Sequence, residues 1–166
     1  MKTKIFSLIV DNSAGVLSRV SGMFSRRGYN IDSLSVGETN DPKISRMTVA
    51  VTGDDKILSQ IKNQLNKLED VKSVEELKYG DAVIRELVIF KVKADADDRQ
   101  KIISIANVYR ANIVDVSKNS IMVELTGNDN KIEAFKDLLD GFEIQEIVRT
   151  GVTGLVRGRV EEQAES

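Results

Sequence analysis

Apolar and polar positions follow two alternating periods along this 166-residue chain. Alternation at every second residue predicts strands, and apolar spacing of i, i+3/i+4 and i+7 predicts amphipathic helices. In the first half, the strands are predicted at residues 3–10, 31–36, 44–52 and 71–77. The first helix ends at Gly28, and its predicted apolar face is Val16, Leu17, Val20, Met23 and Phe24. The second begins at Asp54 or Asp55, and its apolar face is Ile57, Ile61, Leu65 and Leu68.

The second half of the chain repeats the βαββαβ order of the first. Strands are predicted at residues 83–93, 113–117, 121–126 and 144–148, and helices at 97–110 and 131–139. The helices are expected to turn inward Ile102, Ile103, Ala106, Tyr109, Ile132, Phe135, Leu138 and Leu139. The run TGDDKI at residues 52–57 also resembles TGNDNKI at residues 126–132. The fold class predicted is therefore α+β, with two tandem ferredoxin-like sandwiches.

The domain boundaries follow from this repeat. The first domain is placed at residues 1–78 and the second at 82–158, and the polar segment 159–166 is expected to be a flexible tail. Glycines at positions 151, 154 and 158 match neither a P-loop nor a dinucleotide-binding fingerprint. We interpret this segment as a flexible C-terminal strand or a docking segment.

Missing residue types narrow the possible functions. The chain has no His and no Cys, which excludes cysteine nucleophiles, Ser-His-Asp triads and His/Cys zinc sites. We expect neither catalytic residues nor a metal site in this chain. Its formal net charge is −2, and residues 44–51 lack the aromatic side chains of RNA-recognition modules. The absence of Cys and of a signal peptide pattern favours a cytoplasmic protein.

The candidate binding feature is the turn between the first strand and the first helix. Asn12, Ser13 and Ala14 are small or polar, and Gly15 allows a ligand to approach the backbone. A helix N-terminus has unpaired N–H groups and a partial positive charge, so a carboxylate can bind there without a basic side chain. An ordinary helix cap would also explain these residues. Asn30 offers a second amide, although an Asn after a closing glycine is also a common loop residue.

The second repeat differs at the equivalent joint. Its residues, KADADD at 93–98, include three carboxylates and no glycine, so they would repel an anion. A requirement of folding alone does not explain this difference between the repeats. The anion-binding interpretation therefore applies to the N-terminal repeat.

The sequence also resembles a known family along nearly its whole length. The matching motifs include LSRV at 17–20, RGYNI at 27–31, SRMT at 45–48, REL at 85–87 and RTGV at 149–152. These resemble the small, regulatory subunit of acetohydroxyacid synthase (acetolactate synthase). The resemblance implies an ACT domain followed by an ACT-like domain, with feedback inhibition by valine in branched-chain amino-acid biosynthesis.

The same resemblance implies partners and site residues. The partner would be a large catalytic subunit that holds thiamine diphosphate, a divalent metal and FAD, and which the small subunit activates. ACT domains of the family pair edge to edge, and the effector lies between two subunits. The positions that correspond to the family's binding site are Asn12, Ser13, Ala14, Gly15, Val16 and Leu17 from one chain and Asn30 and Ile31 from the other.

Two other classes of function are compatible with the residues. One is a stand-alone tandem-ACT amino-acid sensor that regulates a different partner. The other is an enzyme that uses carboxylates or Lys as acid and base. Co-purification with a thiamine-dependent subunit would distinguish the regulatory subunit from the sensor, and turnover of pyruvate by the isolated chain would be needed for the enzyme.

Overall fold

The computed structural model describes residues 1–158 and divides the chain into two compact units. The first comprises residues 1–84 together with the segment from Gly154, and the second comprises residues 85–153. The division falls within one strand, a few residues after the boundary predicted from sequence. The predicted tail at 159–166 lies outside the described residues.

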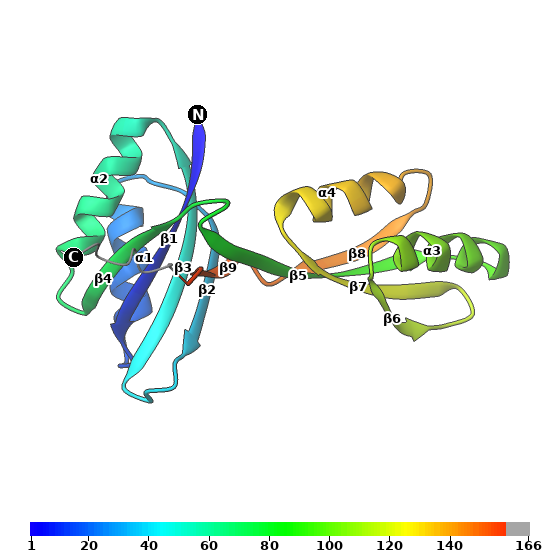
Figure 1. The fold of residues 1–166 in the computed structure, drawn as a ribbon, viewed down its shortest axis with the longest axis horizontal. Helices are drawn as coiled ribbons and strands as arrows, with labels where there is room; N and C mark the ends of the chain where they lie inside the picture. Colours follow the sequence, from blue (N-terminus) through cyan, green and yellow to red (C-terminus); the bar gives the residue numbers. More distant parts are fainter. Residues whose placement is uncertain (159–166) are drawn as a thin grey trace, which may run out of the picture. The chain divides into compact units, whose positions relative to one another are not determined.

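The first unit is a four-stranded antiparallel sheet with two helices on one face (Figure 1). Its elements, in chain order, are β1 (Lys2–Asp11), α1 (Val16–Arg26), β2 (Ile31–Glu38), β3 (Ile44–Gly53), α2 (Asp55–Asn66) and β4 (Val71–Leu77). The strand order is β2-β3-β1-β4, so β2 and β4 are the edge strands of this sheet. The predicted βαββαβ order is confirmed.

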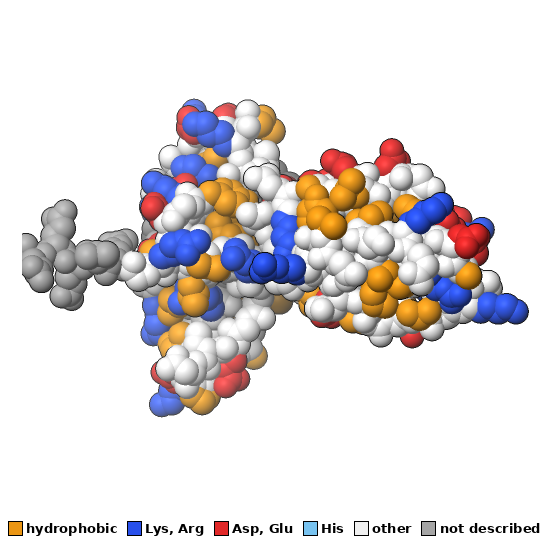
Figure 2. All heavy atoms as spheres, turned by 45° about the vertical axis from the view of Figure 1, so that its right-hand side comes forward, with side chains coloured by type: hydrophobic (Ala, Val, Ile, Leu, Met, Phe, Trp, Pro, Cys, Tyr) orange, Lys and Arg blue, Asp and Glu red, His pale blue; other side chains and the backbone are white. Residues whose placement is uncertain are grey.

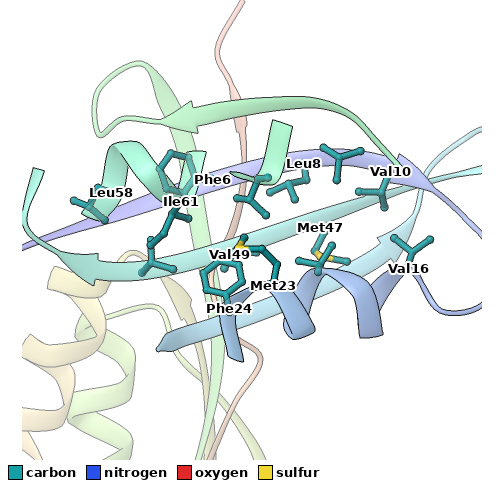
Figure 3. Close-up of a cluster of buried hydrophobic side chains, with 14 residues drawn as sticks. Phe6, Leu8, Val10, Val16, Met23, Phe24, Met47, Val49, Leu58 and Ile61 are labelled. Atoms are coloured by element: carbon teal, nitrogen blue, oxygen red, sulfur yellow. The ribbon is translucent and has the colours of Figure 1, made fainter. Parts of the chain in front are cut away.

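The core of the first unit lies between the helices and the two central strands (Figure 3). The helices contribute Val16, Val20, Met23, Phe24, Leu58, Ile61 and Leu65, and the central strands contribute Phe6, Leu8, Val10, Met47, Val49 and Val51. Because side chains alternate along a strand, these six strand residues share one face of the sheet. The core therefore holds α1, and with it the turn before α1, in a defined position.

The second unit has the same architecture. Its elements are β5 (Ala82–Lys93), α3 (Ala96–Val108), β6 (Asn112–Val116), β7 (Ser120–Gly127), α4 (Asp129–Leu138) and β8 (Ile144–Arg149), in the strand order β6-β7-β5-β8. Its core contains Val88, Phe90, Val92, Ile102, Ala106, Ile121, Val123, Leu125, Ile132 and Phe135. The prediction of a tandem α+β fold is thus confirmed. In this unit one inward assignment was wrong, because Leu138 is exposed while its neighbour Leu139 is buried.

The glycine-containing segment forms a further strand, β9 (Thr153–Val156), which pairs with β5. Gly154 is required for this pairing, since a Cβ atom there would lie 2.5 Å from the backbone oxygen of Val83. Residues 154–158, which we placed in the second domain from sequence, group by contacts with the first unit. Gly154 therefore reflects the close approach of two strands, and no phosphate-binding loop is needed to explain it.

Candidate functional site

The turn between β1 and α1 is built on a glycine in a left-handed conformation. Gly15 is the N-cap residue of α1 and has φ 88° and ψ −7°. This region is readily accessible to glycine and costs other residues about 1–2 kcal/mol, so the backbone itself selects glycine here. Arg19 N donates a hydrogen bond of 2.9 Å to Gly15 O and closes the first helical turn.

The N-terminus of α1 differs from that of every other helix in the described part of the chain. No side chain caps α1, and its first turn contains no acidic residue. By contrast, Asp54, Asp95 and Asn128 each accept a hydrogen bond from a backbone N–H at the start of α2, α3 and α4. Val16 N makes a long bond of 3.5 Å to Ser13 O, and no side chain accepts from the N–H groups of this first turn, which therefore keeps hydrogen-bonding capacity and the positive end of the helix dipole.

Asn12 fastens this turn to the loop between β2 and β3. Its backbone N donates to Lys43 O at 2.8 Å, and its side-chain Nδ2 donates to Pro42 O at 2.8 Å. Asn12 therefore positions the turn, with its side-chain oxygen as the remaining acceptor. The adjacent Ser13 and Ala14 are exposed.

The two apolar residues predicted for the site point in different directions. Val16 is 3% exposed and belongs to the core, so only its backbone can face a ligand. Leu17, which we expected on the apolar face of the helix, is 48% exposed. Leu17 is therefore available at the surface of the first turn as an apolar contact.

Asn30 and Ile31 lie at the opposite end of α1 from this turn. The 11 residues of α1 separate them, which corresponds to about 16 Å along the helix axis. Asn30 Nδ2 donates to Asp32 Oδ1 at 3.4 Å, and Ile31 packs partly buried against the core. Within one chain, the structure brings residues 12–17 together and keeps Asn30 and Ile31 apart from them.

Sequence reasoning missed a charged group that lies beside the turn. The terminal nitrogen Nη1 of Arg19 lies 2.8 Å from the position that a Cβ atom on Gly15 would occupy. Arg19 Nε donates a hydrogen bond to Asp70 Oδ2, across 51 residues of sequence. The spacing of Gly15 and Arg19 was the available signal, because helical side chains lean toward the N-terminus and cover the preceding turn.

Two ion pairs lie beside the turn. Lys72 Nζ lies 3.2 Å from Asp11 Oδ1, and Arg19 pairs with Asp70. The hydrogen bond with Asp70 raises the pKa of Arg19, burial opposes this shift, and the negative charges of Asp70 and Glu69 add to it. Arg19 therefore remains a cation beside the positive end of α1, and the two pairs leave the helix terminus itself without an anion.

Other types of site find less support in the described part of the chain. No group of three or more acidic, His or Cys side chains there could hold a metal ion, and no helix there is long and apolar enough to cross a membrane. A depression of about 520 Å³ in the first unit is lined mainly by charged residues such as Glu75, Glu76 and Lys78. The face in Figure 2 intersperses positive, negative and hydrophobic side chains, unlike the basic surface of a nucleic-acid binder.

Comparisons with known proteins agree with both halves of this fold. Residues 6–73 match the family described as the AHAS small subunit-like ACT domain. Residues 85–158 match the family described as the small subunit of acetolactate synthase. Together the two matches cover both units of the structure.

Individual relatives match over nearly their whole length. The probable acetolactate synthase small subunit of Methanothermobacter thermautotrophicus is 48% identical over 157 residues, which are 94% of this chain and 94% of that protein. The small subunit of acetolactate synthase isozyme 3 of Escherichia coli is 44% identical over 156 residues, which are 93% of this chain and 96% of that protein. The crystal structure of the acetolactate synthase small subunit of Thermotoga maritima superimposes with a TM-score of 0.86 at 38% identity, covering 96% of this chain and 100% of that one.

Proposed function

This chain belongs to the family of acetolactate synthase small subunits, and from this premise we propose that it confers feedback inhibition by valine on a catalytic large subunit. We further propose that it raises the activity of that subunit. The large subunit would hold thiamine diphosphate, a divalent metal and FAD, and this chain would hold no cofactor. The complex would act in the cytoplasm, in branched-chain amino-acid biosynthesis.

The observation that carries the effector proposal is the uncapped N-terminus of α1. An amino-acid carboxylate would accept hydrogen bonds from the first-turn N–H groups and would be stabilised by the helix dipole. Gly15 lets the ligand approach the backbone, and Leu17 offers an exposed apolar surface to its aliphatic side chain. The corresponding terminus of α3 carries Asp95, Asp97 and Asp98, so this chemistry is confined to the N-terminal unit.

Pairing of two chains through β2 would complete the site. β2 is an edge strand, and its last residue Glu38 pairs with Ser45 beside the Asn12 turn, whereas its first residue Ile31 pairs with Val51 at the other end. In an antiparallel pair of β2 strands, the start of one strand opposes the end of the other. Such a homodimer would bring Asn30 of one chain toward the Asn12–Gly15 turn of its partner.

The regulatory mechanism proposed is thermodynamic linkage. If valine binds one quaternary state more tightly, it shifts the population toward that state, and the activity of the complex changes with it. A coupling free energy of about 1–3 kcal/mol changes affinity 5- to 150-fold. A small apolar pocket discriminates valine from leucine or isoleucine only modestly, by about 1–3 kcal/mol per methylene.

Calorimetric titration with valine tests the site when it compares Gly15→Asp with Gly15→Asn. The two side chains have nearly the same shape, and Asn and Asp both tolerate the left-handed conformation better than other residues do. A carboxylate that repels the ligand would abolish binding in Gly15→Asp and spare much of it in Gly15→Asn. Equal binding by the wild type and both variants would refute the assignment of the site.

Mixed dimers test whether the site is shared between chains. A Gly15→Asp chain and an Asn30→Ala chain, carrying different affinity tags, are co-expressed and purified as the heterodimer. A shared site leaves one intact site per heterodimer, because the unmodified turn of one chain meets the unmodified Asn30 of the other. A site within a single chain leaves none, so loss of all valine binding would contradict the dimer proposal.

Co-purification with a thiamine-dependent large subunit separates the regulatory subunit from a stand-alone sensor.

A further inference from the structure

Arg19 links the turn at Gly15 to Asp70, which lies far from that turn in the sequence. Its backbone N donates to Gly15 O, and its Nε donates to Asp70. Its Nη1 lies 2.8 Å from the position that a Cβ atom on Gly15 would occupy. Its side chain is half-exposed, whereas that of Asp70 is 19% exposed. The guanidinium group is therefore anchored at Nε and presents its terminal nitrogens beside the turn.

The placement of this cation is electrostatically unusual. Acidic side chains are favoured near helix N-termini and basic ones near C-termini, because the N-terminus carries partial positive charge. Arg19 nevertheless lies beside the N-terminus of α1, where no acidic residue stands in the first turn. Asp70 compensates the guanidinium, whereas no side chain caps the terminus of α1 and no acidic residue stands in its first turn. An anion at the turn would be stabilised by both positive groups at once.

We propose that Arg19 is an anion-binding residue of the effector site, whose terminal nitrogens bind the effector carboxylate while Asp70 holds its Nε. This inference rests on the proposed function, because it assumes that an amino acid binds at the Asn12–Gly15 turn. Guanidinium groups suit carboxylates since their N–H groups form a planar fork that binds both oxygens. Asp70 acts as a positioning residue that reduces the freedom of a long side chain before the ligand arrives.

The same geometry gives the Gly15→Asp substitution a second effect. An aspartate at position 15 would bring its carboxylate beside the guanidinium of Arg19. The two groups would form an ion pair, and Arg19 could then no longer bind the carboxylate of the effector. Gly15→Asn adds the same Cβ atom, so the flexible end of Arg19 must shift in both variants, but the amide has no charge that would pair with the guanidinium. The two variants thus differ through Arg19 as well as through direct repulsion.

The decisive experiment compares valine with valinamide, which has the same side chain and amine but no carboxylate. Calorimetric titrations use the full chain as wild type, Arg19→Gln and Arg19→Lys, with Arg26→Gln as the matched control at the other end of α1. Removing a hydrogen bond to a charged group is expected to weaken valine binding about 10- to 100-fold in Arg19→Gln. Valinamide has no carboxylate for Arg19 to bind, so its weak binding should change little. The ratio of valine affinity to valinamide affinity should therefore fall in Arg19→Gln.

Three outcomes are distinguishable. Partial recovery in Arg19→Lys, which keeps the charge without the fork, together with unchanged binding in Arg26→Gln supports the role of Arg19. Equal loss of valine and valinamide binding in Arg19→Gln would show a merely structural role and overturn the inference. If the wild type binds no branched-chain amino acid, the proposed function itself is refuted.

Asp70→Asn gives an independent measurement, because it keeps Arg19 and weakens its anchor by removing the negative charge. Valine affinity should fall by a smaller factor than in Arg19→Gln, since the guanidinium still reaches the turn but is less well positioned. Thermal unfolding of each variant checks that the first unit remains folded. If Arg19→Gln and Asp70→Asn both remain folded and both keep the wild-type preference for valine over valinamide, the inference is also overturned.

Discussion

Glu86 on β5 and Arg149 on β8 face each other through two parallel hydrogen bonds of 2.9 Å, from Arg149 Nε to Oε1 and from Nη2 to Oε2. The Glu86 side chain is only 6% exposed, whereas that of Arg149 is 37% exposed. Arg149 also lies 3.7 Å from Asp129 and 3.9 Å from Glu133, both on α4. The pair thus connects the strands by which the chain enters and leaves the second unit.

The two partners of this pair should differ in their effect on stability. Arg149→Met leaves the buried carboxylate of Glu86 unpaired. We expect the free energy of unfolding to fall by about 2–4 kcal/mol, slightly less than the loss on breaking a fully buried ion pair, because Arg149 is partly exposed. Glu86→Gln leaves Arg149 half in water with two other carboxylates nearby, so about 1–2 kcal/mol is expected. Urea unfolding measures both values, and the opposite ranking would contradict this account of the pair.

The pH dependence of the pair follows from the pKa of Arg149. Its hydrogen bond with Glu86 raises this pKa, burial opposes the shift, and the charges of Glu86, Asp129 and Glu133 add to it. A base with a higher pKa in the folded state stabilises the fold fully below its unfolded pKa, and this contribution is lost only as the pH rises through the folded pKa. The difference in unfolding free energy between wild type and Arg149→Met should therefore stay constant from about pH 7 to about pH 10.

Arg149→Lys is the matched control for this pH prediction. Lysine has an ordinary pKa of about 10.4, so its contribution should begin to fall near the upper end of the same range. The unfolding free energies of Arg149→Lys and wild type should then diverge as the pH rises. A wild-type contribution that falls as early as that of Arg149→Lys would show that Arg149 is not its source.

Gly154→Ala should weaken the pairing of β9 with β5. The added methyl group would meet Val83 O at 2.5 Å and the Cα of Ile84 at 3.2 Å, and rigid backbone cannot move aside as a side chain can. A cost of about 1–3 kcal/mol is expected from such overpacking. Gly158→Ala is the control, because nothing lies within 4 Å of its Cβ position. Hydrogen exchange along β5 would detect the loss, and equal protection in both variants would contradict it.

Helix caps should matter at α2 and not at α1. Asp54 Oδ1 accepts a hydrogen bond of 2.8 Å from Ile57 N, so Asp54→Ala should cost about 0.5–2 kcal/mol. The side chain of Ser13 caps nothing at α1, and Ser13→Ala should stay within about 0.5 kcal/mol of the wild type. Thermal unfolding without effector checks both, and a large loss in Ser13→Ala would mean that its hydroxyl supports the turn.

Local spacing along the chain was sufficient to predict most of the fold. Val16, Val20, Met23 and Phe24 recur at the helical period, and all four are buried in α1. The same spacing misassigned Leu138, which lies at the last turn of α4, where a helix ends and its neighbours no longer cover every apolar position. Leu58, which is fully buried, was absent from the predicted face of α2 because Ile57 fits the same spacing.

The candidate turn was also visible in the sequence, since Gly15 marks the joint and an acidic cap is missing. The long-range contacts that hold this turn could not be predicted from the sequence. Arg19 reaches Asp70 across 51 residues, and Asn12 binds Pro42 across 30. No short-range pattern predicts such contacts, because they depend on which strands become neighbours in the sheet.

The sequence by itself determined the two βαββαβ repeats and the difference between their first helix termini, because periodicity and capping depend on residues within a few positions of one another. The tertiary structure alone decided that β9 pairs with β5, that Glu86 faces Arg149, and that Asp70 holds Arg19. Each of these contacts follows from strand order and packing, through which residues distant along the chain share one surface.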